Sequence, residues 1–356
     1  MSEEGPLLSI VVPAYNRAAY LPALLDSVVR ELDGIESGLR EQVEVCISDN
    51  ASTDNTAEVA AAYSHALTLR FGRNETNLGP DRNFLAAVAM ARGRFCWLMG
   101  SDDAIEAGGL LRVLDAVRAW PEAAGFSVNV AGYDPELKGR AWIREPLPHV
   151  SDGLHAGAGA IYGSFVGHWG YLSAQVVRRA LWQELAASLP VERFLNGYVH
   201  VYLIANMTRR VPAWGYLTQR CVCWRSGNDS FLQGDWLRRM KIDVVGYDAI
   251  TAEIFGDDPA VARTATNEIV STHLLSHFRS AKARGRSARS IREAAFLLTR
   301  RYWRVPGYWR KLLPLILVPT VVTSRLFPLY VRHVRSHLIA GMARPNGARP
   351  EGERLR

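Results

Sequence analysis

The chain has 356 residues, which at roughly 100–200 residues per domain fits two domains or one large domain with an appendage. Apolar residues make up 48% and charged residues 22%, which excludes a disordered or fibrous protein, and four cysteines are too few for a disulfide scaffold. Residues 279–356 hold 18 basic and 3 acidic residues, whereas residues 1–278 hold 24 basic and 32 acidic residues. The net charge of +7 therefore belongs to the C-terminal segment. The acidic remainder argues against a nucleic-acid enzyme with a basic catalytic face.

The first 110 residues alternate strand-like and helical patterns. Apolar residues at helical spacing predict helices over 21–32, from residue 56 and over 82–91. Such alternation with short links implies right-handed crossovers and a parallel sheet, in which ligands bind at the carboxyl ends of the strands. Short apolar or β-branched runs predict these strands at Leu8–Val12, Val43–Ile47, Leu67–Phe71 and Arg94–Met99.

Polar side chains follow three of these four strands. Because the carboxyl ends of parallel strands share one edge of a sheet, we expect these side chains to converge there. They are Tyr15, Asn16, Asp49, Asn50, Asp102 and Asp103.

The rest of the chain divides by pattern. Strand-like pieces near Gly125–Ala131 and Tyr171–Val177 alternate with helical ones, and Trp236–Arg304 is mostly helical. The Gly-, Pro- and charge-rich end predicts disorder. We therefore expect a first half at 1–120, a second half at 121–232, a helical basic extension at 233–342 and a disordered tail at 343–356.

The run Leu312–Ser324 is uncharged but interrupted by prolines. A membrane span needs about 20 apolar residues, so this run is too short for one. Aromatic residues alternate with arginines just before it, which favours a helix lying in the membrane interface. A helix packed on the protein with a solvated basic face, and a span or re-entrant hairpin, are the alternatives.

Asp102 and Asp103 are adjacent carboxylates after an apolar strand. Mg²⁺ and Mn²⁺ prefer oxygen ligands and are often shared with substrate phosphates, so the pair is a candidate metal site. A loop carboxylate that caps a helix would give the same pattern.

Four motifs occur in order with helix-sized gaps: SIVVPAYNR, VCISDNASTDNT, NETNLGPDRNF and FCWLMGSDD. Together they resemble the family 2 glycosyltransferases. The resemblance implies the GT-A fold, an α/β architecture with a Rossmann-like, mostly parallel sheet flanked by helices. It also implies a nucleotide-sugar donor site, an acceptor-binding second half and a divalent metal, Mg²⁺ or Mn²⁺.

The resemblance assigns donor-site roles residue by residue. The family's acidic residue that contacts the base matches Asp49, and its Asp-x-Asp motif matches Gly100-Ser101-Asp102, so that the first carboxylate is missing. Asp102 then stands in the metal-ligand position, with Asp103 beside it. The other implied donor contacts are Pro13, Tyr15, Asn16, Arg17, Asn50, Asn77, Gly79, Arg82, Ser101 and Arg225.

The second half more narrowly resembles the abequosyltransferase-like branch, which adds deoxysugars to lipid-linked O-antigen intermediates. The stretch HWGYLS, the tripeptide Tyr198-Val199-His200 and the loop Arg-Ser-Gly-Asn-Asp (225–229) carry this resemblance. That loop could fold over the donor through Arg225, or it could be a plain surface turn.

An inverting member of the family needs a general base, which the family supplies from a Glu-Asp pair opening a helix. The corresponding stretch, Leu195–His200, has no carboxylate, so His200 is the first candidate, because an imidazole pKa of about 6.5 suits proton abstraction. A substrate contact and a structural role are the alternatives for His200, and a retaining enzyme needs no such base. His168 is the rival candidate for the base and Asp229 the third, and Asp103 is a further catalytic carboxylate. Candidate acceptor contacts are His168, Trp169 and Asn228.

The predicted function is transfer of one sugar from a nucleoside diphosphate sugar to a hydroxyl of a polyprenyl diphosphate-linked glycan. We expect a peripheral enzyme on the anionic cytoplasmic face of the cell membrane, without a nucleic-acid partner. The processive signature Q-x-x-R-W is missing, which favours single transfer. A catalytically inactive glycan- or nucleotide-binding scaffold is one alternative. A sugar nucleotidyltransferase is another, although PAYNRAAY is not the Gly-rich loop it would need.

Overall fold

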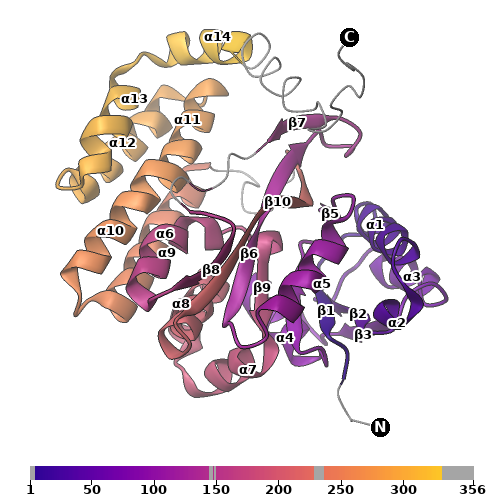
Figure 1. The fold of residues 1–356 in the computed structure, drawn as a ribbon. Coiled ribbons are helices and arrows are strands. Elements are labelled where there is room, and N and C mark those ends of the chain that lie inside the picture. The colour runs from indigo at the N-terminus through magenta and orange to yellow at the C-terminus, as the bar shows by residue number, and fades with distance from the viewer. Residues whose placement is uncertain (1–4, 144–146, 148–149, 228–235, 331–356) are drawn as a thin grey trace, which may run out of the picture.

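A computed structural model describes residues 5–143, 147, 150–227 and 236–330 (Figure 1). Its centre is one mixed, mostly parallel sheet with strand order β3-β2-β1-β4-β9-β6-β10-β5. β1 pairs in parallel with β2 and β4, and β6 with β10, whereas β9 runs antiparallel between β4 and β6. The strands are β1 Leu8–Ala14, β2 Val43–Asp49, β3 Leu69–Arg73, β4 Phe95–Leu98, β5 Ala104–Ile105, β6 Gly125–Tyr133, β7 Arg140–Ile143, β8 Gly153–Ala156, β9 Gln175–Arg178 and β10 Ala213–Arg225.

Helices cover both faces of this sheet, which is why β1 is apolar at nearly every position rather than at alternate ones. Ile10 and Val12 face one hydrophobic core, and Val11 faces the other. The helices of the first half are α1 Leu21–Asp33, α2 Ser37–Arg40, α3 Thr56–Ala62, α4 Pro80–Ala89 and α5 Gly109–Ala119. Those of the second half are α6 Ala158–Trp169, α7 Arg179–Ser188 and α8 Val199–Arg210.

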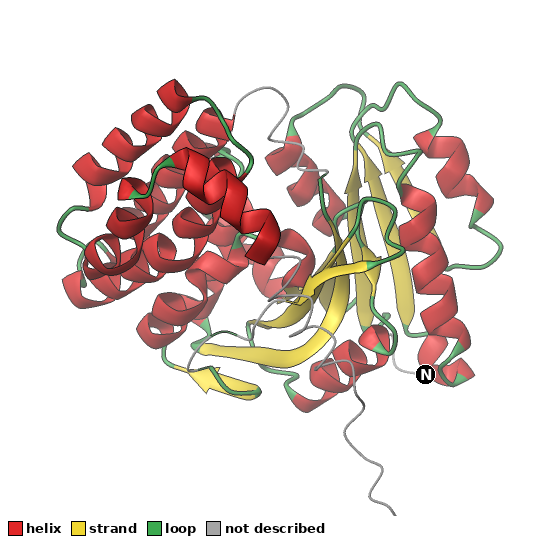
Figure 2. Ribbon diagram, turned by 90° about the horizontal axis from the view of Figure 1, so that it is seen from above, coloured by secondary structure: helices red, strands yellow, loops and turns green. Residues whose placement is uncertain are grey.

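The C-terminal extension is a helical layer beside the sheet, as Figure 2 shows. A π-helical turn, η4 (Val270–Leu274), joins α10 to α11. Later, α13 and α14 are separated at Val318 and Pro319, so the uncharged run is not one helix. Among the described helices, none combines the length and apolarity that a membrane crossing requires. The helices are α9 Trp236–Phe255, α10 Pro259–Ile269, α11 Leu275–Ala283, α12 Ala288–Tyr302, α13 Leu313–Leu317 and α14 Thr320–Tyr330.

Glycines of α6 allow the extension to dock closely. A Cβ added at Gly159 would lie 2.6 Å from Val261, and one at Gly163 would lie 2.9 Å from Thr264, both of which are on α10. The two glycines are four residues apart and therefore share a helix face. Their missing side chains let α10 approach the backbone of α6.

The predicted α/β architecture and helical extension are confirmed. All four predicted strands of the first half exist, although β3 begins at Leu69 rather than Leu67. Sequence patterns missed α6, whose residues are apolar around most of the helix, and they missed the length of β10. The predicted disordered tail at 343–356 lies outside the described residues.

Replacing Gly163 by Leu is expected to lower the free energy of unfolding by about 1–3 kcal/mol, because the new side chain overlaps Thr264. Gly38→Leu on the exposed helix α2 is the matched control, since a Cβ there meets no atom within 4 Å. Denaturant unfolding of both variants measures the difference. Equal stability of the two variants would contradict close docking of α10 on α6.

Candidate functional site

The loops after β1 and β2 are tied together at the carboxyl edge of the sheet. Asn16 adopts a left-handed backbone with φ of 53°, which asparagine tolerates better than most residues. Its Oδ1 accepts a hydrogen bond from the Thr53 backbone N–H at 2.8 Å, and its own N–H donates to Ser52 Oγ at 2.8 Å. The Arg17 backbone N–H donates to Thr56 Oγ1 in the same way. Tyr15, between Pro13 and Asn16, is 43% exposed at this edge.

Asp49 ends β2 beneath these loops and is fully buried. Its Oδ1 accepts hydrogen bonds from the backbone N–H and hydroxyl of Ser52. Its Oδ2 lies 3.6 Å from Arg73 Nη1 and has no hydrogen-bond partner. Because a buried carboxylate oxygen without a hydrogen bond is costly, Oδ2 is an acceptor suited to a ligand donor.

The Asn50 side chain forms hydrogen bonds with the loop that precedes α4. Its Nδ2 donates to Asn77 Oδ1 at 2.8 Å and to the Gly79 carbonyl at 3.2 Å, while its Oδ1 accepts from the Leu78 N–H at 2.9 Å. Gly79 has φ of 81° and precedes α4. Asn50 thus positions the predicted donor loop rather than facing it. Farther along, Arg82 forms an ion pair with Glu192.

Asp103 is a buried junction between the two halves of the chain. Its Oδ2 accepts hydrogen bonds from Tyr171 Oη at 2.6 Å and Ser173 Oγ at 2.5 Å. Its Oδ1 accepts from the Arg225 backbone N–H at 3.0 Å. Burial, and then the charge of Asp102, raise the pKa of Asp103 to about 7. Both oxygens already have donors, so the site does not favour Asp103 as a metal ligand.

Asp102 is half-buried beside this junction, and Ser101 is buried. Gly100 stands in place of the first carboxylate of the expected Asp-x-Asp motif. A Cβ at Gly100 would lie 3.1 Å from Asp103 Oδ2, 3.1 Å from Ser173 Oγ and 3.2 Å from Asp102 Oδ1. A side chain at this position would therefore have to displace these side-chain oxygens by a few tenths of an ångström, and Asp102 is the half-buried carboxylate of the motif.

Arg225 ends β10 and is fixed rather than loose. Its Nε donates to the Asp102 carbonyl at 2.7 Å, another guanidinium nitrogen donates to the Pro135 carbonyl, and the group lies 5.2 Å from the Tyr20 ring centre. It therefore braces the Asp102 loop from β10. Two further predicted residues, Asn228 and Asp229, lie outside the described residues.

The structure places His200 in the core, not at the sheet edge. It is only 3% exposed, and its ring contacts Phe84 and Tyr198 at centroid distances of 5.8 and 6.0 Å. Burial lowers the pKa of His200 to about 4, which weakens it as a base near neutrality. Its burial and lowered pKa therefore argue against His200 as the base that takes the acceptor proton.

The predicted acceptor contacts His168 and Trp169 are also buried. Trp169 is 0% exposed and packs 5.4 Å from Trp214, so it has no free face for a sugar. His168 is 2% exposed, with its Nε2 3.2 Å from the Val128 carbonyl. The prediction is wrong for both because α6 lies between the sheet and α10.

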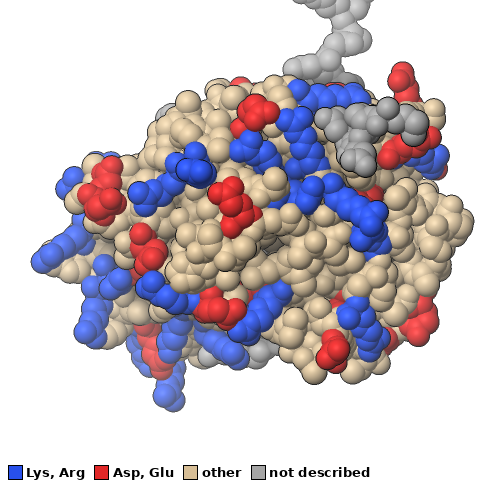
Figure 3. Space-filling view, turned by 90° about the horizontal axis from the view of Figure 1, so that it is seen from below, with Lys and Arg blue, Asp and Glu red and all other residues tan. Residues whose placement is uncertain are grey.

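An arginine-lined cavity of about 590 Å³ lies at the opposite, amino edge of the sheet. Figure 3 views the molecule from that side, where basic side chains gather. Arg94 and Arg178 both contact Glu122, and Arg179 donates to the Gly93 carbonyl. These arginines hold the strand ends together, and none of the residues predicted for the donor site lines this cavity.

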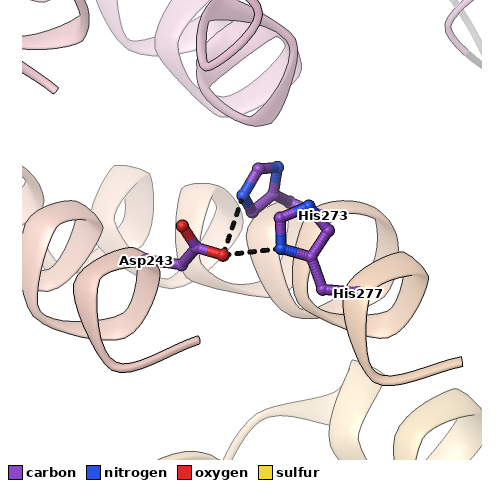
Figure 4. Close-up of side chains that lie close together, drawn as sticks. All are labelled: Asp243, His273 and His277. Carbon is purple, nitrogen blue, oxygen red and sulfur yellow. Dashed lines mark hydrogen bonds and ion pairs between the residues drawn. The ribbon is translucent and has the colours of Figure 1, made fainter. Parts of the chain in front are cut away.

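Sequence reasoning missed a side-chain cluster in the extension, drawn in Figure 4. Asp243 of α9 faces His273 of η4 and His277 of α11, and their potential ligand atoms lie within 4.8 Å of one another. The i, i+4 spacing of the two histidines was the available signal. Without the tertiary structure, nothing in the sequence links them to Asp243.

The sequence is similar to those of known glycosyltransferases. Residues 9–171 match the family described as Glycosyl transferase family 2. The chain is 29% identical over 276 residues to abequosyltransferase RfbV of Salmonella typhimurium, which covers 74% of this chain and 80% of that protein. The chain is therefore similar to glycosyltransferase family 2 over its first half. More narrowly, it is similar to the abequosyltransferase-like branch, which confirms the resemblance found in the sequence.

Solved structures confirm the GT-A fold that the sequence resemblance implies. S. aureus TarS 1–349 in complex with UDP aligns with a TM-score of 0.57 at 18% identity, covering 91% of each chain. The mannosyltransferase PcManGT from Pyrobaculum calidifontis, in complex with GDP-Man and Mn²⁺, aligns with a TM-score of 0.50 at 14% identity, covering 90% of this chain and 88% of that one.

The two adjacent aspartates are expected to behave differently on truncation. Asp103→Ala leaves the donors of Tyr171, Ser173 and Arg225 without their acceptor, so the free energy of unfolding should fall by roughly 3–5 kcal/mol. Asp102→Ala should cost under about 1 kcal/mol, because Asp102 is half-buried. Denaturant unfolding without metal measures both. A larger loss in Asp102→Ala would contradict these assignments.

Proposed function

We propose that this protein transfers one sugar from a nucleoside diphosphate sugar to a hydroxyl of a lipid-linked glycan in O-antigen-like polysaccharide synthesis. The observation that carries the proposal is the carboxyl edge of the sheet, where Asp49 presents a buried acceptor oxygen and Asp102 a reachable carboxylate. The similarity to an abequosyltransferase over most of both chains supports the O-antigen-like acceptor. Neighbouring folds that bind UDP, UDP-GlcNAc and GDP-Man support the donor class.

In this proposal the donor lies across the loops that follow β1, β2 and β4. Asp49 Oδ2 accepts a hydrogen bond from the nucleoside base, and Tyr15 flanks it from the adjacent loop. The loop held by Asn50, from Asn77 to Gly79, closes the same side. The first half thus binds the donor, residues 121–232 bind the acceptor, and the extension supports the second half.

The donor set at Asp102 fits a hard divalent cation. One carboxylate is enough, because Mg²⁺ and Mn²⁺ are often held by one or two carboxylates together with substrate phosphates. When bound, Mg²⁺ or Mn²⁺ would neutralise charge that develops on the diphosphate leaving group. Arg225 and Asp103 hold the Asp102 loop in place for this role.

We further propose that the extension holds the enzyme peripherally on the cytoplasmic face of the membrane, near a polyprenyl diphosphate acceptor. Large apolar side chains are exposed at the C-terminal end of the described chain, where Leu317 is 71% and Val321 60% exposed. Buried Lys282 donates to the carbonyls of Leu315, Ile316 and Val318 and so fixes this segment on α11. Basic residues nearby, each worth about 1 kcal/mol at an anionic surface, are Arg300, Arg304, Arg310, Lys311 and Arg325.

Calorimetric titration with UDP, CDP, GDP and dTDP, with and without Mn²⁺, tests the donor site. We expect one nucleotide to bind in a metal-dependent way, and Asp102→Ala to weaken that binding at least tenfold. Asp115→Asn, on the exposed face of α5, is the control and should bind like the wild type. Failure of folded wild-type protein to bind any of the four would contradict a metal-dependent transferase and favour the inactive scaffold.

Sedimentation with vesicles tests the membrane surface. Wild-type protein should bind phosphatidylglycerol-containing vesicles and lose binding as salt rises, because charge screening weakens the attraction. Val321→Asp should reduce binding several-fold, since it places a charge on the apolar face. Leu111→Asp, also at an exposed aliphatic residue but on α5, is the control. Equal binding to neutral phosphatidylcholine vesicles would contradict an electrostatic contribution.

A further inference from the structure

The side chains of Asp243, His273 and His277 meet where three helical segments of the extension come together (Figure 4). His273 Nε2 lies 3.5 Å and His277 Nδ1 lies 2.6 Å from the same carboxylate oxygen, Asp243 Oδ2. Imidazole nitrogens and a carboxylate oxygen are ligands that zinc commonly takes in proteins. None of the residues proposed for the donor site belongs to α9, η4 or α11, so the cluster is a separate feature of the molecule.

The spacing of the three atoms suits a single ion. Two ligands of a tetrahedral Zn²⁺, each at about 2.0–2.1 Å, are roughly 3.3 Å apart. The 3.5 Å separation of His273 Nε2 and Asp243 Oδ2 is close to this value. The 2.6 Å contact of His277 Nδ1 is a hydrogen bond, which would lengthen by about 0.7 Å when an ion takes the place of the shared proton. The His277 side chain is 31% exposed and has room for so small a rotation.

The second oxygen of the Asp243 carboxylate is held by other groups. Asp243 is fully buried, and its Oδ1 accepts a hydrogen bond from Tyr198 Oη at 2.5 Å and lies 3.1 Å from Arg239 Nε. Carboxylates that bind a metal are typically fixed by hydrogen bonds from a second layer of residues. Because Tyr198 and Arg239 contact Oδ1, the carboxylate is oriented with Oδ2 toward the two histidines.

The ligands are in the protonation states that a metal requires. Burial lowers the pKa of His273 to about 4, so this imidazole is neutral near pH 7 and keeps a lone pair. Burial alone would raise the pKa of Asp243, but the neighbouring histidines hold it well below its usual range. The carboxylate is therefore ionised, which offsets the charge of Arg239 beside it. A neutral imidazole and an ionised carboxylate are the forms that bind Zn²⁺.

The local structure of the chain also marks this position. His273 lies in η4, which is a π-helical turn, and such turns are rare and occur frequently at functional sites. His277 lines a cavity of about 60 Å³ together with Trp236 and Ser280. This volume exceeds the roughly 10–15 Å³ that one water molecule needs. A water molecule can therefore complete the coordination of an ion that has three protein ligands.

We propose that Asp243, His273 and His277 bind one Zn²⁺ ion that joins α9 to η4 and α11. The ion takes Asp243 Oδ2, His273 Nε2 and His277 Nδ1 as ligands, with water in the fourth position. The site differs from the one proposed for Mg²⁺ or Mn²⁺ at Asp102, because imidazole nitrogens favour zinc over these harder cations. Its role is to fasten three segments of the extension together, and it supplies no step of the sugar transfer.

Zinc binding by the full chain tests this site without any sugar donor. Protein dialysed against EDTA should take up one equivalent of Zn²⁺ in calorimetry, and its Tm should rise by several degrees at saturating zinc, because the ion binds the folded state. His277→Gln should lose both the uptake and the Tm shift. His65→Gln, at an exposed histidine of the first half, is the matched control and should keep both. Asp102→Ala should also keep both, which separates this ion from a donor-site metal.

Wild-type protein that takes up no zinc and shows no Tm shift would overturn the proposal and leave a hydrogen-bonded cluster. Zinc retained by His277→Gln, or lost from Asp102→Ala, would place the ion elsewhere. Co²⁺ bound to the wild type provides a test that does not require the variant to fold. Visible absorption bands of a tetrahedral Co²⁺ site that zinc abolishes are expected, and their absence would contradict the proposed ligands. Nucleotide binding is measured separately, so none of these results decides the proposed function.

Discussion

Three strands of the sheet depend on one buried carboxylate. Asp103 follows β4, yet the groups that donate to it come from the segment before β9 and from the end of β10. Burying a carboxylate costs free energy unless hydrogen-bond donors surround it. The segment before β9 and the end of β10 must therefore stay close to Asp103. The positions of Asp102, Gly100 and Arg225 all follow from this junction.

This junction separates two roles within the Asp-Asp pair. Asp103 is a scaffold whose oxygens are already used, and Asp102 remains half-buried at the edge. Gly100, which replaces the first carboxylate of the motif, packs closely against Asp103 and Ser173. A departure from the family pattern is therefore compatible with a working metal site.

The extension contributes more than support. It docks through the glycines of α6, buries His168 and Trp169 beneath it, and sends Asp243 to the hydroxyl of Tyr198 at the opening of α8. A helical layer that the sequence marks mainly by its basic charge thus contacts the first residues of α8. Its far end presents apolar residues such as Leu317 to solvent.

The sequence alone determined the strands of the first half, their parallel order of crossovers and the edge where Asp49 and Asp102 lie, because local periodicity and strand-end position encode these features. It also showed a resemblance to the family 2 glycosyltransferases through four ordered motifs. Burial and long-range partners were decided only by the tertiary structure: His200 and Trp169 had to be seen inside the core, and Asp243 had to be brought to His277 from another helix. Contacts between segments far apart in the chain depend on packing, which no local pattern specifies.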